Sequence, residues 1–275
     1  MTKKINGLSP RALGAWAVIT GGSSGIGLSH AQILAKHGFN LLLAARDENK
    51  LQSAAKLLEG GHGVQVRTVS ADLATSEGQV SLTDEMNLLD VGVLIGNAGA
   101  PVPGWFTETD LDQYQKSVGL KINTNLAVAH TAARQMRDKG RGAILLVSST
   151  GGLQGIPYLS NNSAAEAFVL SLGEALHHEL KPIGVKASVL LPGPTKTPAF
   201  DQMAGDKKLP MAPMSSDATA YEGLSALMRG EPTWVAGRMN RIMTKLMSRH
   251  AGSKLMGSMM RKLFDVTPLV GGDRV

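Results

Sequence analysis

Short apolar runs alternate along the chain with longer segments whose apolar residues recur at helical spacing. The runs are rich in Val, Ile and Leu, and uninterrupted apolar runs of this length suit strands that are buried on both faces. They cover residues 15–20, 40–44, 64–69, 91–96, 143–148 and 185–191. The segments between them, which we expect to be helices, cover 25–38, 48–58, 76–88, 111–139 and 160–180. The alternation predicts an α/β fold with a doubly wound parallel sheet.

Composition fits a single domain over residues 1–275. With 43% hydrophobic residues the chain can bury one sizeable core. It has no cysteine, so disulfides and thiolate metal sites are excluded. His130, His177 and His178 lack the spacing of metal ligands, and we assign them no chemistry. Without these ligands we expect no metal. The first apolar run leads directly into a glycine turn and does not resemble a signal peptide, so we expect a cytoplasmic protein.

The net charge of +6 is concentrated towards the C-terminus. Seven Lys or Arg and no acid lie between Pro232 and Phe264, which leaves 21 bases and 22 acids elsewhere. Apolar and basic residues recur there at helical spacing, with Met239, Ile242, Met243, Leu246 and Met247 opposite Arg238, Arg241, Lys245 and Arg249, followed by Leu255, Met256, Met259, Met260, Leu263 and Phe264. Such a segment can lie on a membrane surface or line an apolar substrate pocket, but packing against the domain or another subunit is the favoured interpretation. The scarcity of aromatic residues argues against a nucleic-acid partner.

The turn after the first apolar run carries the strongest chemical signal. It reads Thr20-Gly21-Gly22-Ser23-Ser24-Gly25-Ile26-Gly27. Glycines between a strand and a helix permit a tight turn and let the backbone approach a pyrophosphate, which the free N–H groups and dipole of the helix favour. The turn therefore indicates a dinucleotide site of the Rossmann type rather than a turn without a ligand.

The end of the second apolar run distinguishes between the two nicotinamide cofactors. It reads Ala44-Ala45-Arg46, where NAD-binding Rossmann proteins tend to place an acid for the ribose hydroxyls. An arginine suits a 2′-phosphate instead, so NADP(H) is the expected cofactor and NAD(H) is less favoured. The alternative is that Arg46, which precedes Asp47, is a solvated surface side chain.

Further motifs follow the later strands in order. Asp72-Leu73 follows the third, Asn97-Ala98-Gly99 the fourth, and Pro192-Gly193-Pro194-Thr195-Lys196-Thr197 the sixth. With the glycine turn, they resemble the motifs of the short-chain dehydrogenase/reductase family over residues 12–200, and residues 199–275 are expected to form a substrate loop and the basic extension. The resemblance implies an adenine contact at Asp72-Leu73 and a nicotinamide contact after the sixth strand. The cofactor-binding residues it implies are Thr20, Gly21, Ser23, Ser24, Gly25, Ile26, Gly27, Arg46, Asp72, Leu73, Asn97, Ala98, Gly99, Pro192, Gly193, Thr195 and Thr197.

The resemblance also implies a catalytic serine after the fifth strand, a Tyr-x-x-x-Lys on the next helix and an asparagine on the preceding one. Ser149 fits the serine. By ungapped counting, however, Asn162 stands at the tyrosine position, Glu166 at the lysine position and Lys121 at the asparagine position. In the family the lysine lowers the pKa of the tyrosine, so that the phenol can exchange a proton with the substrate oxygen. An amide and a carboxylate cannot do this, so an atypical active site is predicted.

Lys121 and Glu166 together suggest an exchange of charge. If the helices pack as in the family, the ammonium and the carboxylate would meet in the cleft, whereas either charge alone would carry a desolvation cost of several kcal/mol. Using Asn123 or Asn125 in place of Lys121 would require a deletion inside a helix. Tyr158, one turn before Asn162, is an alternative proton donor, although a cleft-wall aromatic is the simpler interpretation.

Three functions are compatible with these residues. The favoured one is an NADP(H)-dependent reductase of an imine, iminium or activated C=C bond in a small hydrophobic molecule, with Glu166 stabilising positive charge and Ser149 and Asn162 orienting the substrate. The alternatives are a non-redox isomerase, cyclase or lyase that keeps the nucleotide as a scaffold, and a nucleotide-binding pseudoenzyme with a regulatory role. We expect residues 197–216 and the basic extension to build the substrate pocket. The resemblance implies a homodimer or homotetramer formed through the helices at 111–139 and 160–180.

Overall fold

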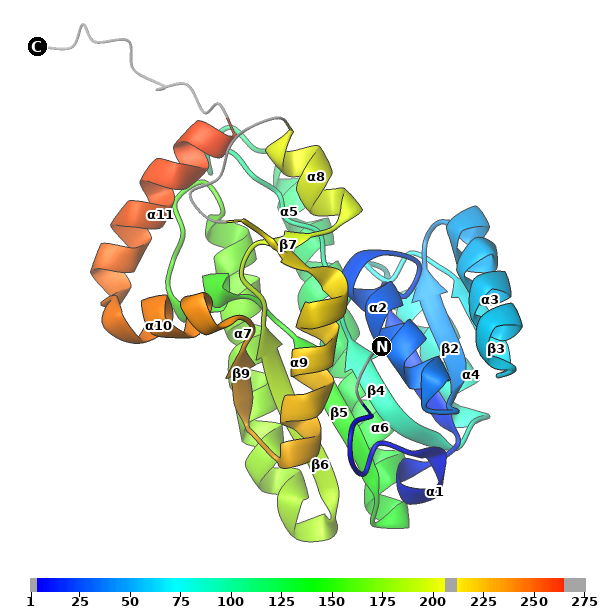
Figure 1. Ribbon diagram of the computed structural model, residues 1–275. Helices are drawn as coiled ribbons and strands as arrows, with labels where there is room; N and C mark the ends of the chain where they lie inside the picture. Colours follow the sequence, from blue (N-terminus) through cyan, green and yellow to red (C-terminus); the bar gives the residue numbers. More distant parts are fainter. Residues whose placement is uncertain (1–3, 206–211, 265–275) are drawn as a thin grey trace, which may run out of the picture.

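Seven parallel strands form one sheet at the centre of the computed structural model, which describes residues 4–205 and 212–264 (Figure 1). The strands are β1 (Trp16–Thr20), β2 (Asn40–Ala45), β3 (Val66–Ser70), β4 (Val91–Gly96), β5 (Gly142–Val147), β6 (Val185–Leu191) and β9 (Thr233–Val235). Their order is β3-β2-β1-β4-β5-β6-β9, and neighbouring strands are parallel. The predicted doubly wound fold is confirmed. Its strand order reverses between β1 and β4, and ligands of such sheets bind beyond the carboxyl ends of the strands at this point.

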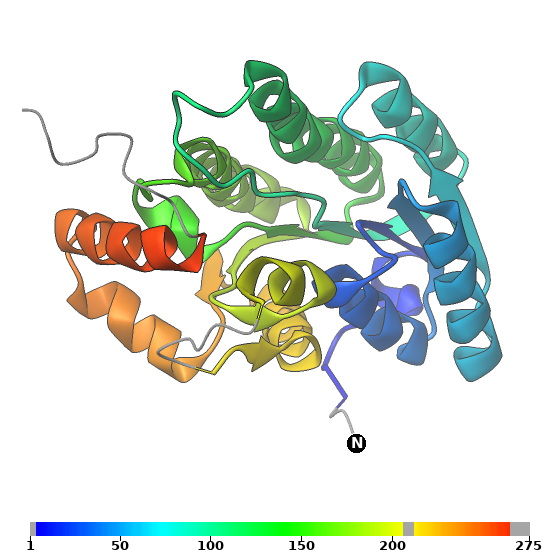
Figure 2. The same ribbon diagram turned by 90° about the horizontal axis from the view of Figure 1, so that it is seen from above.

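Helices cover both faces of the sheet (Figure 2). One face carries α2 (Gly25–Lys36), α3 (Glu48–His62) and α9 (Ser216–Arg229), and the other carries α4 (Ser76–Asn87), α6 (Thr124–Lys139) and α7 (Ser160–Leu180). Two apolar clusters fill the layers, one including Leu34 and Leu224 and the other including Leu82, Val128 and Val169. Because both faces are covered, β1, β4 and β5 are buried at every position, as their apolar runs predict.

The third apolar run differs from its prediction. We expected residues 64–69 to be buried on both faces, but β3 is an edge strand in which only Val69 is buried. Arg67 is exposed and pairs with Glu85 at 3.3 Å. The run contains Gln65, Arg67 and Thr68, which suit a partly solvated edge better than a central strand.

The long helix expected at 111–139 is interrupted. It consists of α5 (Leu111–Val118), a π-helical segment at Gly119–Asn123 and α6. The Thr124 hydroxyl, which is fully buried, donates to the Leu73 carbonyl at 2.6 Å and so ties this segment to the end of the third strand. A π-helical segment inside an α-helix changes the direction of the side chains it carries and is frequent at functional sites. Lys121 lies within it.

The part of the chain after β6 contains elements that the apolar pattern did not predict. They are β7 (Thr195–Lys196), α8 (Pro198–Ala204) and β8 (Met214–Ser215), in addition to α9 and β9, whereas α10 (Arg238–Leu246) and α11 (Arg249–Leu263) confirm the helical spacing of the basic extension. The remaining elements of the described chain are α1 (Pro10–Leu13) and the 3-10 turns Thr150–Leu153 and Lys181–Ile183. Residues 206–211 of the expected substrate loop and 265–275 of the extension lie outside the described residues. Among the helices described, none has the length and apolar character needed to cross a bilayer.

The two helices of the basic extension differ in how they pack. Met260 and Leu263 of α11 are buried against Ile156 and Leu159, which confirms packing on the domain for this helix. By contrast, α10 has no buried residue. For the apolar side of α10, packing on the domain is therefore wrong, and packing on another subunit stays a prediction.

Candidate active site

The glycine turn joins β1 to α2 with almost no room for side chains. Gly21 and Gly25 have φ values of 67° and 53°, a conformation that favours glycine. A Cβ added at Gly27 would collide with the Gly21 carbonyl oxygen. Ser24 is the N-cap of α2, but its side chain makes no capping hydrogen bond, and the first turn contains no acid. The first N–H groups of α2 therefore remain available for an anion.

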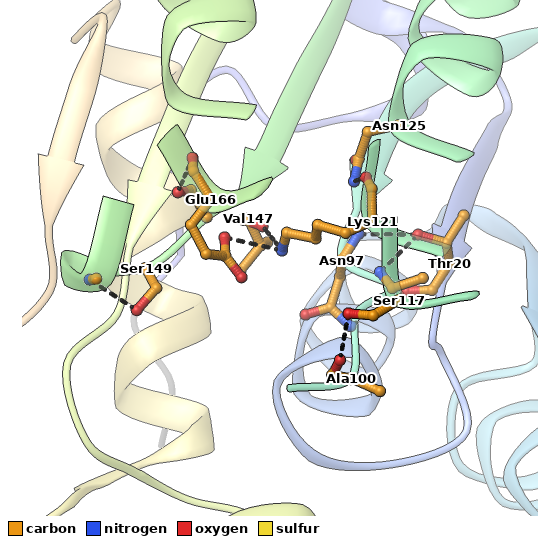
Figure 3. A network of polar contacts seen from close by, with 12 residues as sticks. Thr20, Asn97, Ala100, Ser117, Lys121, Asn125, Val147, Ser149 and Glu166 are labelled. Carbon is orange, nitrogen blue, oxygen red and sulfur yellow. Dashed lines mark hydrogen bonds and ion pairs between the residues drawn. The ribbon is translucent and has the colours of Figure 1, made fainter. Parts of the chain in front are cut away.

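Hydrogen bonds between Thr20 and the segment after β4 hold the glycine turn in place. The buried Thr20 hydroxyl oxygen accepts hydrogen bonds from the backbone N–H groups of Asn97 and Ala98 at 2.8 and 2.9 Å. The Asn97 amide donates in return to the Thr20 carbonyl at 3.1 Å (Figure 3). The side chains of Thr20 and Asn97 thus join the two strands at the reversal point, and Gly99 is exposed just beyond them.

The residues expected to bind the adenosine half lie around the ends of β2 and β3. Arg46 is exposed at the end of β2. Asp47 does not pair with it in the described structure: it caps α3 and forms an ion pair with Lys50 at 3.1 Å. The hydrogen bond from the Lys50 backbone N–H, helped by its ammonium group, lowers the pKa of Asp47. A cavity of about 440 Å³ beside them is lined by Ser23, Leu28, Asp47, Asn49, Lys50, Ser53, Ala54 and Leu57. Asp72 is exposed nearby and Leu73 is buried.

The segment after β6 reaches the glycine turn. The Pro192 carbonyl accepts from the Thr150 N–H at 2.9 Å, and the Thr195 hydroxyl donates to the Gly193 carbonyl at 2.9 Å. Thr197 caps α8, and its methyl group would contact a Cβ at Gly25. The loop that the sequence assigned to the pyrophosphate and the segment that it assigned to the nicotinamide therefore border one site.

A buried ion pair joins the π-helical segment before α6 to α7. Lys121 Nζ lies 3.1 Å from Glu166 Oε2, and both side chains are less than a tenth exposed (Figure 3). The hydrogen bond of the ammonium goes to the Val147 carbonyl at 2.7 Å, whereas its contact with Glu166 Oε2 lacks hydrogen-bond geometry. The predicted meeting of these two charges is confirmed. A Cβ at Gly99 would lie 3.4 Å from Lys121 Nζ, so the ammonium group also adjoins the Asn97-Ala98-Gly99 motif.

The other predicted catalytic residues lie near this pair. Ser149 Oγ accepts from the Gly151 N–H at 3.0 Å, which leaves its proton free to be donated. Asn162 is half-buried on the first turns of α7, one turn before Glu166. Tyr158 has a φ of 66° and packs edge-on against Trp105 with ring centroids 5.0 Å apart.

Asn125 has a structural position. Its buried side-chain amide donates to the Lys121 carbonyl at 2.7 Å, inside the π-helical turn. A Cβ at Gly96 would collide with Asn125 Oδ1, so this side chain is held against β4. Asn125 thus supports the backbone of Lys121 rather than replacing its side chain in the cleft.

Comparison with known proteins identifies the family. The pattern that describes the short chain dehydrogenases matches residues 15–208. The chain belongs to the short-chain dehydrogenase family. This agrees with the sheet order and with the motifs that meet at the reversal point.

Relatives of this family member are oxidoreductases. It is 33% identical over 189 residues to the very-long-chain 3-oxoacyl-CoA reductase of Rattus norvegicus, covering 67% of this chain and 60% of that protein. It is 32% identical over 199 residues to the 17-beta-hydroxysteroid dehydrogenase type 3 of Rattus norvegicus, covering 71% and 65%. The chain thus spans less than two thirds of the length of these relatives.

Solved structures of short-chain dehydrogenases superimpose over most of the chain. A short-chain dehydrogenase from Sphingobium yanoikuyae in complex with NADPH has a TM-score of 0.76 and 28% identity, covering 94% of this chain and 99% of that one. A 7beta-hydroxysteroid dehydrogenase structure with a TM-score of 0.83 and 24% identity, covering 90% and 98%, shares the fold. The backbone cradle described above, whose glycines have no Cβ and whose first α2 N–H groups are not capped by a side chain, fits the pyrophosphate of such a dinucleotide.

Sequence reasoning missed one cluster beside the site. Glu222 of α9 accepts hydrogen bonds from Trp234 Nε1 at 2.8 Å and Arg241 Nη1 at 2.8 Å. Partial burial opposes its ionisation, but these bonds and one from the Gly237 N–H outweigh burial and lower the pKa of Glu222. The cluster borders a cavity of about 350 Å³ lined by Pro194, Ala212, Met214, Glu222, Gly237, Arg238, Met239 and Asn240. No motif signals it, because its members come from separate elements that meet only in the fold.

Proposed function

We propose that this short-chain dehydrogenase is an NADP(H)-dependent oxidoreductase that delivers hydride to an iminium carbon, or to an activated C=C bond, of a small hydrophobic molecule. The cofactor assignment rests on the glycine turn and on Arg46. The N–H groups at the start of α2 would hold the pyrophosphate, Arg46 the 2′-phosphate, and the segment containing Thr195 and Thr197 the nicotinamide end. Bound NADPH supplies the hydride.

The observation that carries the proposal is the Lys121–Glu166 ion pair. An unpaired ammonium in the cleft would repel a cationic substrate, whereas this pair has no net charge. The family's proton donor is also missing, since none of the three tyrosines, Tyr114, Tyr158 and Tyr221, has a lysine four residues later. Hydride addition to an iminium carbon needs no proton, because the electron pair of the C=N bond moves onto nitrogen. The reaction therefore matches an active site without a phenol.

Other residues would position the substrate. The Ser149 hydroxyl can donate a hydrogen bond, and Asn162 can donate or accept one through its amide. With an activated C=C bond, hydride adds to the β-carbon, and the resulting enolate, which is a weaker base than the alkoxide formed from a ketone, takes up a proton from water. Ser149 fits the position of the family's catalytic serine, and we assign its hydroxyl the role of orienting the substrate in both reactions.

A second candidate function is reduction of a 3-oxoacyl thioester. It is favoured by the names of the relatives, several of which are very-long-chain 3-oxoacyl-CoA reductases. Reduction of a ketone produces an alkoxide that must be protonated, and the exchanged residues make this step slow. The ion pair and the missing phenol therefore argue for the first candidate over the second.

The two candidates separate in one assay. NADPH oxidation is followed with cyclic iminium ions, enones, ketones and 3-oxoacyl thioesters, with NADH in parallel. We expect the highest kcat/KM with an iminium ion and a preference for NADPH that falls in Arg46→Ala but not in the control Lys56→Ala. Faster turnover of ketones or thioesters would favour the second candidate. NADPH binding without oxidation of any substrate would favour the non-redox or pseudoenzyme alternatives. A cytoplasmic location and a homodimer or homotetramer stay predictions.

A further inference from the structure

Helix α10 has its polar side on the domain and its apolar side in solvent. Asn240, Arg241 and Thr244 are half-buried: Asn240 packs against Gly193, and Arg241 pairs with Glu222 at 2.8 Å. The apolar residues Met239, Ile242, Met243 and Leu246 are 55%, 42%, 39% and 80% exposed. A helix of a globular protein normally turns its apolar stripe towards the core. Here polar anchors fix the helix with that stripe outwards.

The four exposed residues form one ridge. Their spacing of three, four and seven residues places them on the same side of the helix. At its rim lie the exposed Arg238 and Lys245, with Arg249 at the start of α11. Neither helix contains an acid, and α11 adds the exposed cations Lys254, Arg261 and Lys262. An apolar ridge edged by cations is the pattern of a helix that lies in the interface of an anionic membrane.

The charges around the ridge distinguish an anionic membrane from a second copy of the chain as its binding partner. Two ridges meeting around a twofold axis would bring the cations of both helices together with no acid on either helix to pair them. Anionic head groups would pair the same cations while the lipid chains receive the Met, Ile and Leu side chains. The charge pattern thus opposes self-association and favours lipid.

We propose that α10 is a membrane-docking helix, which inserts Met239, Ile242, Met243 and Leu246 into an anionic lipid surface and places Arg238, Lys245 and Arg249 on the head groups. The same helix adjoins the active site: Arg238, Met239 and Asn240 line the cavity beside Pro194. Docking by α10 would therefore hold that cavity close to the lipid, where hydrophobic molecules accumulate. The docking surface needs neither the cofactor nor the proposed reaction.

Vesicle sedimentation of the full chain tests the proposal. We expect binding to phosphatidylcholine vesicles that contain phosphatidylglycerol, weaker binding at high salt, and little binding to phosphatidylcholine alone. Met239→Ser with Leu246→Ser should abolish binding. Arg238→Gln with Lys245→Gln should weaken it roughly 25-fold, about fivefold for each cation. Matched controls are Leu88→Ser, which changes a residue 72% exposed on the C-cap of α4, and Lys56→Gln, an exposed lysine of α3.

The outcomes are distinct. All substituted residues are exposed, so unchanged thermal unfolding is expected and is checked for each variant. Absence of binding by the wild-type chain, or equal binding by Met239→Ser/Leu246→Ser, would overturn the proposal. So would equal binding to neutral and anionic vesicles. Sedimentation velocity without lipid gives a further test, since self-association that disappears in the double-serine variant would assign the ridge to a second copy instead.

Discussion

At the scale of single residues, the folded state buries two opposite charges, and each charge stabilises the other. Lys121 and Glu166 are each about 5–7% exposed, so either charge alone would be desolvated without a counterion. The ammonium has the Val147 carbonyl as its other partner, at 2.7 Å. Breaking a buried ion pair by removing one member is far more destabilising than removing both.

This asymmetry predicts the result of a double-mutant cycle. We expect Glu166→Gln and Lys121→Met each to lower the free energy of unfolding by ~3–5 kcal/mol, because each leaves one buried charge unpaired. The double variant should be more stable than the sum of the two losses predicts. Urea unfolding measures all four proteins. Additive losses, or single losses of less than about 1 kcal/mol, would show that the two charges are not coupled.

His30, on α2, is fully buried and makes stability depend on pH. Burial lowers its pKa to about 4, and a contact with the Ile26 backbone opposes this only in part. The unfolded chain takes up a proton on this residue below pH ~6.5, whereas the folded chain stays neutral there. Stability is therefore fully present above the unfolded pKa and falls as the pH drops from about 6.5 to about 4.

The predicted loss over this range is ~3 kcal/mol, at 1.36 kcal/mol per unit of pKa shift. The variant His30→Leu should remove most of the slope between these pH values, while the slope below about pH 4, where carboxylates such as Asp90 become protonated, should remain. Chemical denaturation at a series of pH values makes the comparison. The same slope in wild type and variant would contradict the assignment to His30.

At the scale of elements, the approach of α2 to β1 shapes the cofactor cradle. Gly27 is in the first turn of α2, and a Cβ there would collide with the Gly21 carbonyl oxygen. The side chain would push the turn away from the start of the helix and move the free N–H groups that face the pyrophosphate. Space at Gly61 of α3 is open, since nothing lies within 4 Å of an added Cβ.

The variant Gly27→Ala is therefore predicted to lose NADPH affinity by at least about tenfold, or ~1.4 kcal/mol. Gly61→Ala, the matched control, should keep its affinity and gain a little stability from better helix propensity. Isothermal titration calorimetry measures the affinity, and thermal unfolding separates local from global damage. Equal affinity in the two variants would show that the turn does not hold the cofactor.

Some helices and strands could be predicted from the sequence, and others could not. The apolar runs were sufficient for β1, β4 and β5, because central parallel strands are buried on both faces. They did not reveal β9, whose three residues are only half-buried, or the edge position of β3. The π-helical turn around Lys121 has no recognised sequence signal, since it arises from tertiary contacts such as that of Asn125 with the Lys121 carbonyl.

At the scale of the whole molecule, the fold brings the predicted motifs to one edge of the sheet. Ungapped counting suggested that Lys121 and Glu166 would meet, and their ion pair confirms this contact. Counting could not show that Asn97 would form hydrogen bonds with Thr20, or that the apolar side of α10 would face solvent. Both depend on packing between segments far apart in sequence. Local sequence patterns thus predicted the sheet and the cofactor cradle, whereas the residues around the active site could be identified only from the three-dimensional structure.

We propose that this protein keeps an intact cofactor cradle while the residues that handle protons in its family have been exchanged. Restoring the family pattern with Lys121→Asn, Asn162→Tyr and Glu166→Lys tests it most directly, because the ammonium then comes from α7 beside a phenol. NADPH oxidation with a ketone and with an iminium ion is compared in the variant and the wild-type chain, and NADPH affinity reports an intact cradle. We predict that the triple variant gains ketone reduction that the wild type lacks. Ketone reduction that is equally fast in the wild type, or no gain in a variant that still binds NADPH, would contradict it.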